Sequence, residues 1–334
     1  MRIGLAGVGR IGSFHAKTLR QHPEVKSMVL ADADPARARH VADSLGVDAV
    51  ARTEDLFSTA RIDALVIATA TDAHASLIVE GARAGLPVFC EKPVAIDAAQ
   101  TRGVLRRIES ARAPVHIGFQ RRFDSGYMAA RDAVRAGSLG WVHTLRACTL
   151  DAAPPPAEYV PTSGGIFRDC SVHDFDILRW VTGREVVEVY AVGQNRGADF
   201  FRAAGDADAT GTLLTLDDGA IALVSATRYN AAGHDVRLEV LGSKDSLAVG
   251  LDDRLPLRSV EAGVTFPSGK PYTLFLDRFH DAYVRELAAF VDVAAGRRES
   301  PCSVEDALAS LLIAEACEVS RRERRPVRVS EVTV

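Results

Sequence analysis

The sequence predicts an α/β protein of two domains, the first built on an open parallel sheet with helices on both faces. Three observations lead to this fold class. A chain of 334 residues has room for two domains of about 150 residues each. Strand-like and helix-like segments alternate over the first 120 residues. Beyond them, runs rich in β-branched residues predict a second sheet. We therefore expect domains at 1–120 and 121–334.

Five short apolar runs are the predicted strands of the first domain: 2–6, 27–31, 64–68, 87–90 and 115–119. The run 64–68 is apolar throughout, which is typical of a strand buried on both faces. Asp34 followed by Pro35 predicts a helix that begins with a capping acid and proline in its first turn. Thr71 or Asp72 is the predicted cap of the helix after 64–68.

The second domain is predicted to begin with a helix over 124–137 and to end with helices over about 277–296 and 303–322. Its predicted strands are 141–150, 186–192, 209–216, 221–229 and 236–242. Asp217, Asp218 and Gly219 form a hairpin signal, which favours antiparallel pairing. The Pro- and Gly-rich loop 153–165 is long enough to suggest an active-site wall, although a simple crossover is the alternative.

Composition excludes several classes of partner. The net charge of −4 gives no reason to expect nucleic acid or an anionic membrane. No run of about 20 apolar residues is present, and the N-terminus lacks the order of a signal peptide. The five cysteines are scattered without CxxC spacing, so we expect reduced thiols, a cytoplasmic location and no zinc site.

The first strand leads into the motif Gly7-Val-Gly9-Arg10-Ile11-Gly12. Glycines at these places allow a tight turn, a close approach of a pyrophosphate and close packing of helix on strand. Asp32, at the end of the second strand, is placed to hydrogen-bond an adenosine ribose. The pattern predicts a dinucleotide site that prefers NAD to NADP, because a carboxylate repels a 2′-phosphate. Arg37 and Arg39 would soften that preference unless they are plain helix-surface charges.

Two further strand ends supply candidate ligand residues, because ligands of open α/β sheets sit beyond the carboxyl ends of the strands. The first end carries Thr69, Ala70, Thr71 and His74. His74 is equally consistent with capping or packing. The second end is FCEKP, with Glu91 and Lys92. Lys92 has the chemistry to hold a substrate oxygen or to stabilise the charge that builds as an alcohol loses its proton.

The stretch GGIFRDCSVHDFD (164–176) places charged residues within an apolar segment. If it is helical, Asp169 and His173 are four residues apart and share one face. A pair of this kind suits proton transfer. A metal pair is the alternative, but no third and fourth ligand are apparent nearby, so we expect no metal. A buried pair that merely satisfies itself is the structural alternative.

Together, these motifs resemble the glucose–fructose oxidoreductase/inositol dehydrogenase/rhizopine-catabolism (Gfo/Idh/MocA) family. They are GVGRIG, Asp32, FCEKP, GFQRRFDSGY (118–127), GG…D…H and LDRFHDAYVRE (276–286). The resemblance covers essentially the whole chain and is strongest to the bacterial inositol dehydrogenases. It implies an NAD-binding Rossmann domain followed by an α/β domain with a large, open, mostly antiparallel sheet. That sheet commonly forms the interface of a homo-oligomer, a tetramer or a dimer.

The resemblance also implies roles for individual residues. Lys92, Asp169 and His173 are the implied catalytic residues, with His173 taking the hydroxyl proton and Asp169 orienting the imidazole. Gln120 is expected beside the cofactor. Substrate contacts are implied for Lys92, Asp169 and His173 and for four more residues: Arg122, Asp151, His234 and Tyr283. Arg121 is the alternative to Arg122, and packing or surface roles are open for Asp151, His234 and Tyr283.

The function implied is NAD-dependent oxidation of a secondary hydroxyl of a cyclic polyol, myo-inositol to 2-keto-myo-inositol. The sequence departs from the inositol dehydrogenases at 229–235, where Ala-Gly-His-Asp replaces a possible Tyr-Gly-Tyr-Asp. Two alternatives therefore stay open. One is a dehydrogenase of another polyol or sugar, such as scyllo-inositol, a pyranose or levoglucosan. The other is a non-catalytic NAD-binding regulator, against which Lys92, Asp169 and His173 argue.

Overall fold

The computed structural model describes residues 1–58 and 61–332, and the chain forms two compact units. The first unit contains Met1–Gln120 and Tyr283–Leu308, and the second contains Arg121–Ala282 and Ala309–Val334. The predicted second domain, 121–334, differs from the second unit in one segment. Residues 283–308 of that prediction belong to the first unit.

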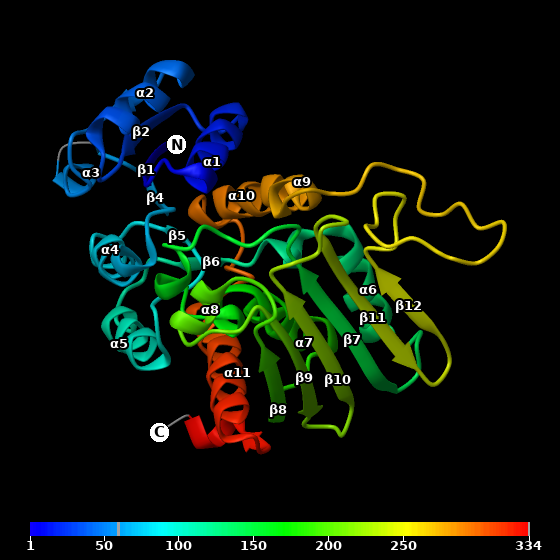
Figure 1. Cartoon of the computed structure of the whole chain (residues 1–334). Coiled ribbons are helices and arrows are strands. Elements are labelled where there is room, and N and C mark those ends of the chain that lie inside the picture. Colours follow the sequence, from blue (N-terminus) through cyan, green and yellow to red (C-terminus); the bar gives the residue numbers. More distant parts are fainter. Residues whose placement is uncertain (59–60, 333–334) are drawn as a thin grey trace. The chain divides into compact units, whose positions relative to one another are not determined.

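The first unit is built on a six-stranded parallel sheet in the order β3-β2-β1-β4-β5-β6 (Figure 1). Its strands are β1 (Arg2–Ala6), β2 (Ser27–Ala31), β3 (Asp48–Ala49), β4 (Ala64–Ile67), β5 (Val88–Glu91) and β6 (Val115–Gly118). The predicted strands lie within one residue of these bounds, and the two-residue β3 was not predicted. The strand order reverses between β1 and β4, which is where ligands of such sheets bind.

Helices α1 (Arg10–Gln21), α2 (Pro35–Leu45), α3 (Asp55–Ser58), α4 (Thr71–Arg83) and α5 (Ala98–Ile108) connect these strands. Asp34 caps α2 as predicted, since its side chain accepts hydrogen bonds from the N–H groups of Ala36 and Arg37. The predicted cap of α4 is wrong. Ala70 occupies the cap position without a side-chain hydrogen bond, and Thr71 already belongs to the helix.

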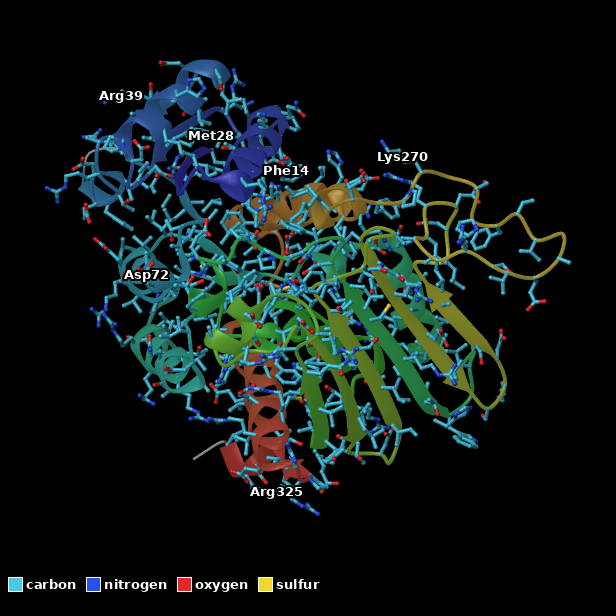
Figure 2. All side chains as sticks on the ribbon, viewed as in Figure 1. Phe14, Met28, Arg39, Asp72, Lys270 and Arg325 are labelled. Atoms are coloured by element: carbon cyan, nitrogen blue, oxygen red, sulfur yellow. The ribbon has the colours of Figure 1, made fainter. Side chains whose placement is uncertain are left out.

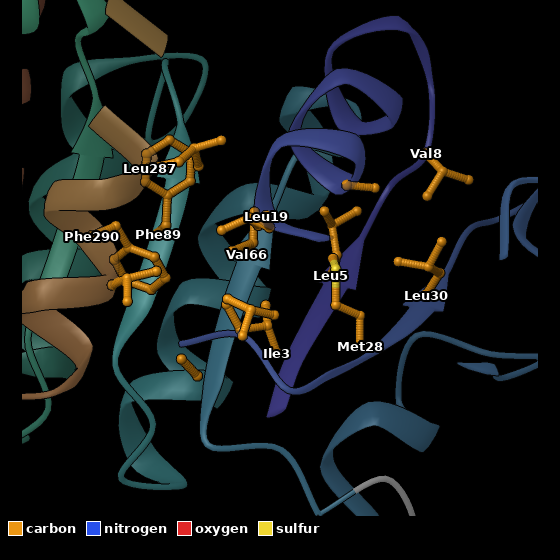
Figure 3. Packing of buried hydrophobic residues seen from close by; sticks show 14 of the residues in the cluster. Ile3, Leu5, Val8, Leu19, Met28, Leu30, Val66, Phe89, Leu287 and Phe290 are labelled. Atoms are coloured by element: carbon orange, nitrogen blue, oxygen red, sulfur yellow. The ribbon is translucent and has the colours of Figure 1, made fainter. Parts of the chain in front are cut away.

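The core of the first unit includes part of helix α10 (His280–Ala294). Leu287 and Phe290 are buried there together with strand residues such as Ile3 and Phe89 (Figure 3). Val291 belongs to the same cluster. The rings of Phe89 and Phe290 lie 5.6 Å apart. This packing is the physical reason why 283–308 belongs to the first unit rather than to the predicted second domain.

The second unit is built on a seven-stranded sheet in the order β12-β11-β7-β10-β9-β8-β13 (Figure 1). The strands are β7 (Val142–Leu150), β8 (Val186–Gln194), β9 (Ala209–Leu216), β10 (Ile221–Thr227), β11 (Asp235–Gly242), β12 (Ser246–Val249) and β13 (Val327–Arg328). Among the described strands of this sheet, β7 and β10 pair in parallel and the other pairs are antiparallel. The carboxyl ends of β7 and β10 therefore meet at one edge, where β11 begins.

Helices α6 (Ser125–Arg135), α7 (Val172–Thr182), α8 (Asp199–Ala203), α9 (Phe275–Arg278) and α11 (Val304–Glu323) complete the chain. The predicted helix 277–296 is divided into α9 and α10 at Phe279, whose backbone leaves the helical conformation. The helix expected across 164–176 begins instead as a π-helical turn, Phe167–Ser171, which leads into α7. Within the described residues, the helices are too short or too polar to cross a membrane.

We expect Phe290→Ala to lower the free energy of unfolding by about 3–5 kcal/mol, because it removes a buried ring from a packed core. Urea titration followed by circular dichroism measures this change. Val284→Ala, at a half-exposed position of the same helix, is the matched control and should cost less than about 1 kcal/mol. Equal effects of the two variants would contradict the role given to α10 in this core.

Candidate active site

The loop after β1 has the backbone geometry of a dinucleotide-binding turn. Gly7 has φ +89°, and a Cβ added there would lie 2.5 Å from the carbonyl oxygen of Ala68. A Cβ on Gly12 would lie 1.9 Å from the carbonyl oxygen of Gly7. Gly9, the cap residue of α1, faces open space within 4 Å of the position of its missing Cβ. Gly7 and Gly12 therefore keep the turn tight, while Gly9 leaves room for an anion at the helix N-terminus.

Asp32 lies immediately after β2 and is 5% exposed. One carboxylate oxygen accepts the Val8 N–H at 2.7 Å, and the other accepts the Asp34 N–H at 2.9 Å. Because a carboxylate has about four acceptor sites, Asp32 can hold this loop and still accept a ribose hydroxyl. The glycine turn and Asp32 together fit an adenine dinucleotide.

The two arginines after Asp32 differ in their surroundings. Arg37 is half exposed and its guanidinium lies 3.2 Å from Asp32 Oδ1, so it offsets part of that negative charge. Arg39 is an exposed residue of α2 and lies at the outer side of the first unit in Figure 2. Arg37 is therefore paired with Asp32, the carboxylate that is expected to favour NAD over NADP. The exposed position of Arg39 favours the alternative of a plain surface charge.

The remaining residues predicted to bind cofactor lie near the same edge of the parallel sheet. Arg10 and Ile11 form the first turn of α1, and Thr69, Ala70 and Thr71 connect β4 to α4. Gln120 follows β6 and is buried. Their cofactor contacts stay predictions.

His74 joins two of these strand ends. It is 2% exposed, and its Nδ1 and Nε2 atoms lie 2.7 Å from the Pro93 oxygen and 3.1 Å from the Thr69 oxygen. The ring thus connects the segment after β4 to the segment after β5 through these two contacts. This arrangement favours packing, the alternative that the sequence left open for His74.

The end of β5 carries Glu91 and Lys92. Glu91 is buried, and its Oε1 atom lies 2.6 Å from Nε2 of His15 on α1, which fixes this strand end against the helix. Lys92 follows directly and is half-buried, with a cis peptide bond to Pro93. The contact between Glu91 and His15 therefore fixes the residue that precedes Lys92.

Tyr283 packs within the first unit. It is 3% exposed, and its ring centroid lies 5.7 Å from that of Phe14 and 5.8 Å from that of His15. These aromatic contacts with α1 favour the packing alternative for Tyr283, and its substrate contact stays a prediction.

In the second unit, the parallel pairing of β7 with β10 brings polar residues together. Asp151 directly follows β7 and Arg228 directly follows β10, while His234 directly precedes β11. The N–H of Asp151 donates to the Thr227 carbonyl at 2.9 Å. Asp151 therefore meets Arg228 and His234 at one edge of the sheet, although 77 residues separate it from Arg228.

Asp169 joins this group from the π-helical turn. Its Oδ1 atom accepts a hydrogen bond from the Tyr159 hydroxyl at 3.0 Å, and its Oδ2 atom accepts one from Arg228 at 2.8 Å. His173 lies four residues on, at the start of α7, and is half-buried. Asp169 and His173 therefore lie on one continuous helical segment, although the turn that carries Asp169 is wider than an α-helical turn, since π-helical bonds span five residues. Such turns occur frequently at functional sites.

Asp151 stands between a histidine and an arginine. Its Oδ1 atom lies 3.5 Å from His234 Nδ1, and its Oδ2 atom lies 3.1 Å from Arg228 Nη1. Burial raises the pKa of Asp151, but the hydrogen bond from His234 and the charge of Arg228 outweigh burial and hold the pKa below its usual value. Asp151 is therefore a carboxylate near neutral pH. Asp151, Asp169 and His234, for which the resemblance implies substrate contacts, lie in one cluster, and the contacts themselves stay predictions.

Arg121 and Arg122 are buried in ion pairs with helix α7. Arg121 donates to Asp174 at 2.6 Å and to the Thr149 hydroxyl at 2.8 Å. Arg122 donates twice to Asp176, through Nε at 2.9 Å and through Nη2 at 2.5 Å. These contacts favour a structural role for both arginines, and the substrate contact of Arg122 stays a prediction.

Sequence reasoning missed Tyr159 and Arg228. Tyr159 lies in the loop 153–165 that was singled out by its length and composition, but no motif marked the residue itself. The sequence did not single out Arg228, because the predicted strand 221–229 includes this residue. In the structure β10 ends at Thr227, so Arg228 directly follows the strand. Among the described residues, no group of three or more His, Cys, Asp or Glu side chains forms a candidate metal site.

The parallel sheet, its glycine turn and Asp32 define the class of the protein: a dinucleotide-binding α/β protein with a second sheet that carries acid, histidine and arginine side chains. Residues 1–119 match the family model described as the oxidoreductase family with an NAD-binding Rossmann fold. Residues 127–248 match the GFO/IDH/MocA C-terminal domain. The chain therefore belongs to the GFO/IDH/MocA family, and the predicted family, fold class and NAD-binding domain are confirmed.

Curated relatives and a solved structure agree over the whole chain. The chain is 36% identical over 331 residues to the inositol 2-dehydrogenase of Rhizobium meliloti, covering 99% of both. It is 34% identical over 335 residues to the myo-inositol 2-dehydrogenase of Thermotoga maritima, again covering 99% of both. A structure of scyllo-inositol dehydrogenase from Lactobacillus casei, with bound NAD(H) and scyllo-inositol, superimposes with a TM-score of 0.89 at 30% identity and covers 99% of each chain.

The glycine turn predicts that two substitutions will have different effects. Gly9→Ala should leave stability unchanged but weaken NADH binding about tenfold or more, because the methyl group occupies space left for the cofactor. Gly12→Ala should also lower the free energy of unfolding by about 1–3 kcal/mol, because its methyl group overlaps the Gly7 carbonyl. Fluorescence titration with NADH and thermal unfolding measure the two effects.

The control is Gly103→Ala in α5, where a Cβ also meets nothing within 4 Å. It should bind NADH as the unsubstituted chain does. Wild-type NADH affinity in Gly9→Ala would contradict the placement of the pyrophosphate at this turn.

Proposed function

We propose that the chain catalyses the NAD-dependent oxidation of a secondary hydroxyl of a cyclic polyol, converting myo-inositol to 2-keto-myo-inositol. The observation that carries the proposal is the cluster of Asp151, Asp169, Arg228 and His234 at one sheet edge, with His173 on the helix that continues from Asp169. Carboxylate and imidazole groups suit a neutral ligand with many hydroxyls. Full-length similarity to enzymes named as inositol dehydrogenases supports the same substrate class.

His173 is the proposed general base, because an imidazole exchanges protons near neutral pH. Asp169 accepts a substrate hydroxyl and stabilises the imidazolium that forms. Lys92 donates to the reacting oxygen and stabilises the negative charge that develops there. NAD, when bound, supplies the acceptor for the hydride that leaves the carbon. The protein's contribution is thus to hold the hydroxyl, to take its proton and to stabilise charge.

Asp32 supports NAD as the cofactor in preference to NADP. The carboxylate is buried and fixed by two backbone N–H groups, so it is held where it would repel a 2′-phosphate. The pairing of Arg37 with Asp32 reduces this repulsion without removing it, since one guanidinium charge is shared with Asp34. We expect a marked preference for NAD with residual use of NADP.

A second copy of the chain is the proposed partner of the large sheet. Tyr190 on β8, Leu213 on β9 and Leu223 on β10 are cross-strand neighbours on one face, and each is 40–45% exposed. Contiguous exposed apolar residues of this kind mark protein interfaces. We propose a homo-oligomer, either a tetramer or a dimer, that buries this face. All five cysteines are buried thiols, which supports a reducing compartment, the cytoplasm.

The proposed reaction predicts NADH formation with myo-inositol that falls by about 10²–10⁴-fold in kcat when His173 is replaced by Ala. Absorbance at the NADH band measures the rate. Substrates are myo-inositol, scyllo-inositol, D-chiro-inositol, glucose, galactose, xylose and levoglucosan, each with NAD and with NADP. His280→Ala, at an exposed position, is the matched control and should retain the full rate.

The outcomes separate the alternatives. Activity on a sugar alone would keep the mechanism and contradict the polyol. NAD binding without turnover of any alcohol would favour a non-catalytic regulator.

The proposed oligomer predicts that Leu213→Lys will lower the mass measured by light scattering, because a charge is placed in the apolar row. Leu257→Lys, at another exposed leucine of the second unit, is the control and should leave the mass unchanged. A monomeric wild-type chain at micromolar concentration would contradict the proposed interface.

A further inference from the structure

We propose that Arg228 is a positioning residue of this site: its guanidinium holds the Asp169 carboxylate in the orientation needed beside His173. The inference rests on the proposed function and extends it to a residue that no sequence motif marks. Arg228 is assigned no contact with substrate or cofactor, so its effect passes through Asp169.

The geometry around the guanidinium is that of a fixed fork. Arg228 is 3% exposed. Its Nη2 atom donates to Asp169 Oδ2 at 2.8 Å, and its Nη1 atom lies 3.1 Å from Asp151 Oδ2 and 2.8 Å from Cys170 Sγ. A planar guanidinium fixes the directions of its N–H groups, so one side chain sets the positions of two carboxylates at once.

The backbone that carries Arg228 is itself fixed. Its N–H donates to the Asp208 carbonyl at 2.8 Å, and Thr227 before it pairs with Leu150 and Ala209 on the two neighbouring strands. The carboxylate of Asp208 in turn accepts two backbone N–H groups, from Arg196 and Gly197. The guanidinium therefore starts from a rigid strand end, which is what a positioning group requires.

The two oxygens of Asp169 have different partners. Arg228 holds Oδ2 from the buried side, whereas Tyr159 donates to Oδ1 from a loop where its own side chain is 42% exposed. The buried contact is the fixed one, because both the cation and its strand are enclosed. The exposed contact is the hydrogen bond from the Tyr159 hydroxyl, and a polyol carries donors of the same kind. Arg228 thus orients the carboxylate while leaving its other oxygen on the accessible side.

Charge gives Arg228 a second effect on Asp169. Asp151 and Asp169 both contact the one guanidinium, so without it the two carboxylates would lose the cation that they share. Burial lowers the pKa of Arg228, but Cys170, Asp169 and Asp151 more than compensate and keep the pKa above its ordinary value. The guanidinium therefore stays charged, and its loss would turn Asp169 away from Asp151.

The test uses the full-length chain and the alcohol that the wild type oxidises fastest. Arg228→Lys keeps the charge but loses the fork, and should lower kcat about 10²-fold while leaving KM for NAD and Kd for NADH within about twofold. Arg228→Met should lose more kcat. Adding Asp151→Asn to Arg228→Met should restore part of it, since the repelling neighbour of Asp169 is removed.

The matched control is Arg179→Lys. Arg179 lies on the same helix as His173 and also pairs twice with one acid, Glu185, but it is ten residues from Asp169 in sequence. Its kcat should match the wild type, and thermal unfolding should show both lysine variants folded.

Three outcomes would overturn the inference. They are a wild-type kcat in a folded Arg228→Lys, an equal loss of kcat in Arg179→Lys, and no recovery in the double variant. A wild type that oxidises a different alcohol would contradict the proposed substrate alone, because the arginine variants are then compared on that alcohol.

Discussion

The parallel pairing of β7 with β10 is the constraint on which the polar cluster of the second unit depends. In an antiparallel pair the two carboxyl ends would lie at opposite edges of the sheet. Here they lie together, so Asp151 and Arg228 become neighbours although 77 residues separate them. The antiparallel start of β11 adds His234 at the same edge. One strand pairing thus decides which side chains can form a site.

Buried ion pairs hold α7, the helix that continues from the turn carrying Asp169. Asp174 and Asp176 of α7 are paired with Arg121 and Arg122, and the start of the π-helical turn is held by Asp206, which accepts the Ile166 N–H at 3.0 Å. Such pairs contribute little net stability, but losing one partner leaves an uncompensated charge. Their effect is to fix the helix and therefore to limit the positions that Asp169 and His173 can adopt.

The first unit shows the same division between support and function. Gly7 and Gly12 are required by the backbone, because a Cβ at either position would overlap a carbonyl group. Gly9 has space for a Cβ, so only the approach of a cofactor requires glycine there. His74 contacts the segments after β4 and β5, and Glu91 fixes the end of β5 against α1, while their contacts with the cofactor stay predictions. Buried polar side chains near a ligand edge thus often hold the loops that carry the ligand contacts.

The sequence by itself determined the parallel sheet, the glycine turn and Asp32, because these depend on local periodicity and on residues close together in the chain. It also placed Asp169 and His173 on one helical segment. Only the tertiary structure showed that α10 from Tyr283 onward packs in the first unit, that a π-helical turn carries Asp169, and that Arg228 lies beside it. These features depend on strand order and packing between distant segments, which local patterns do not encode.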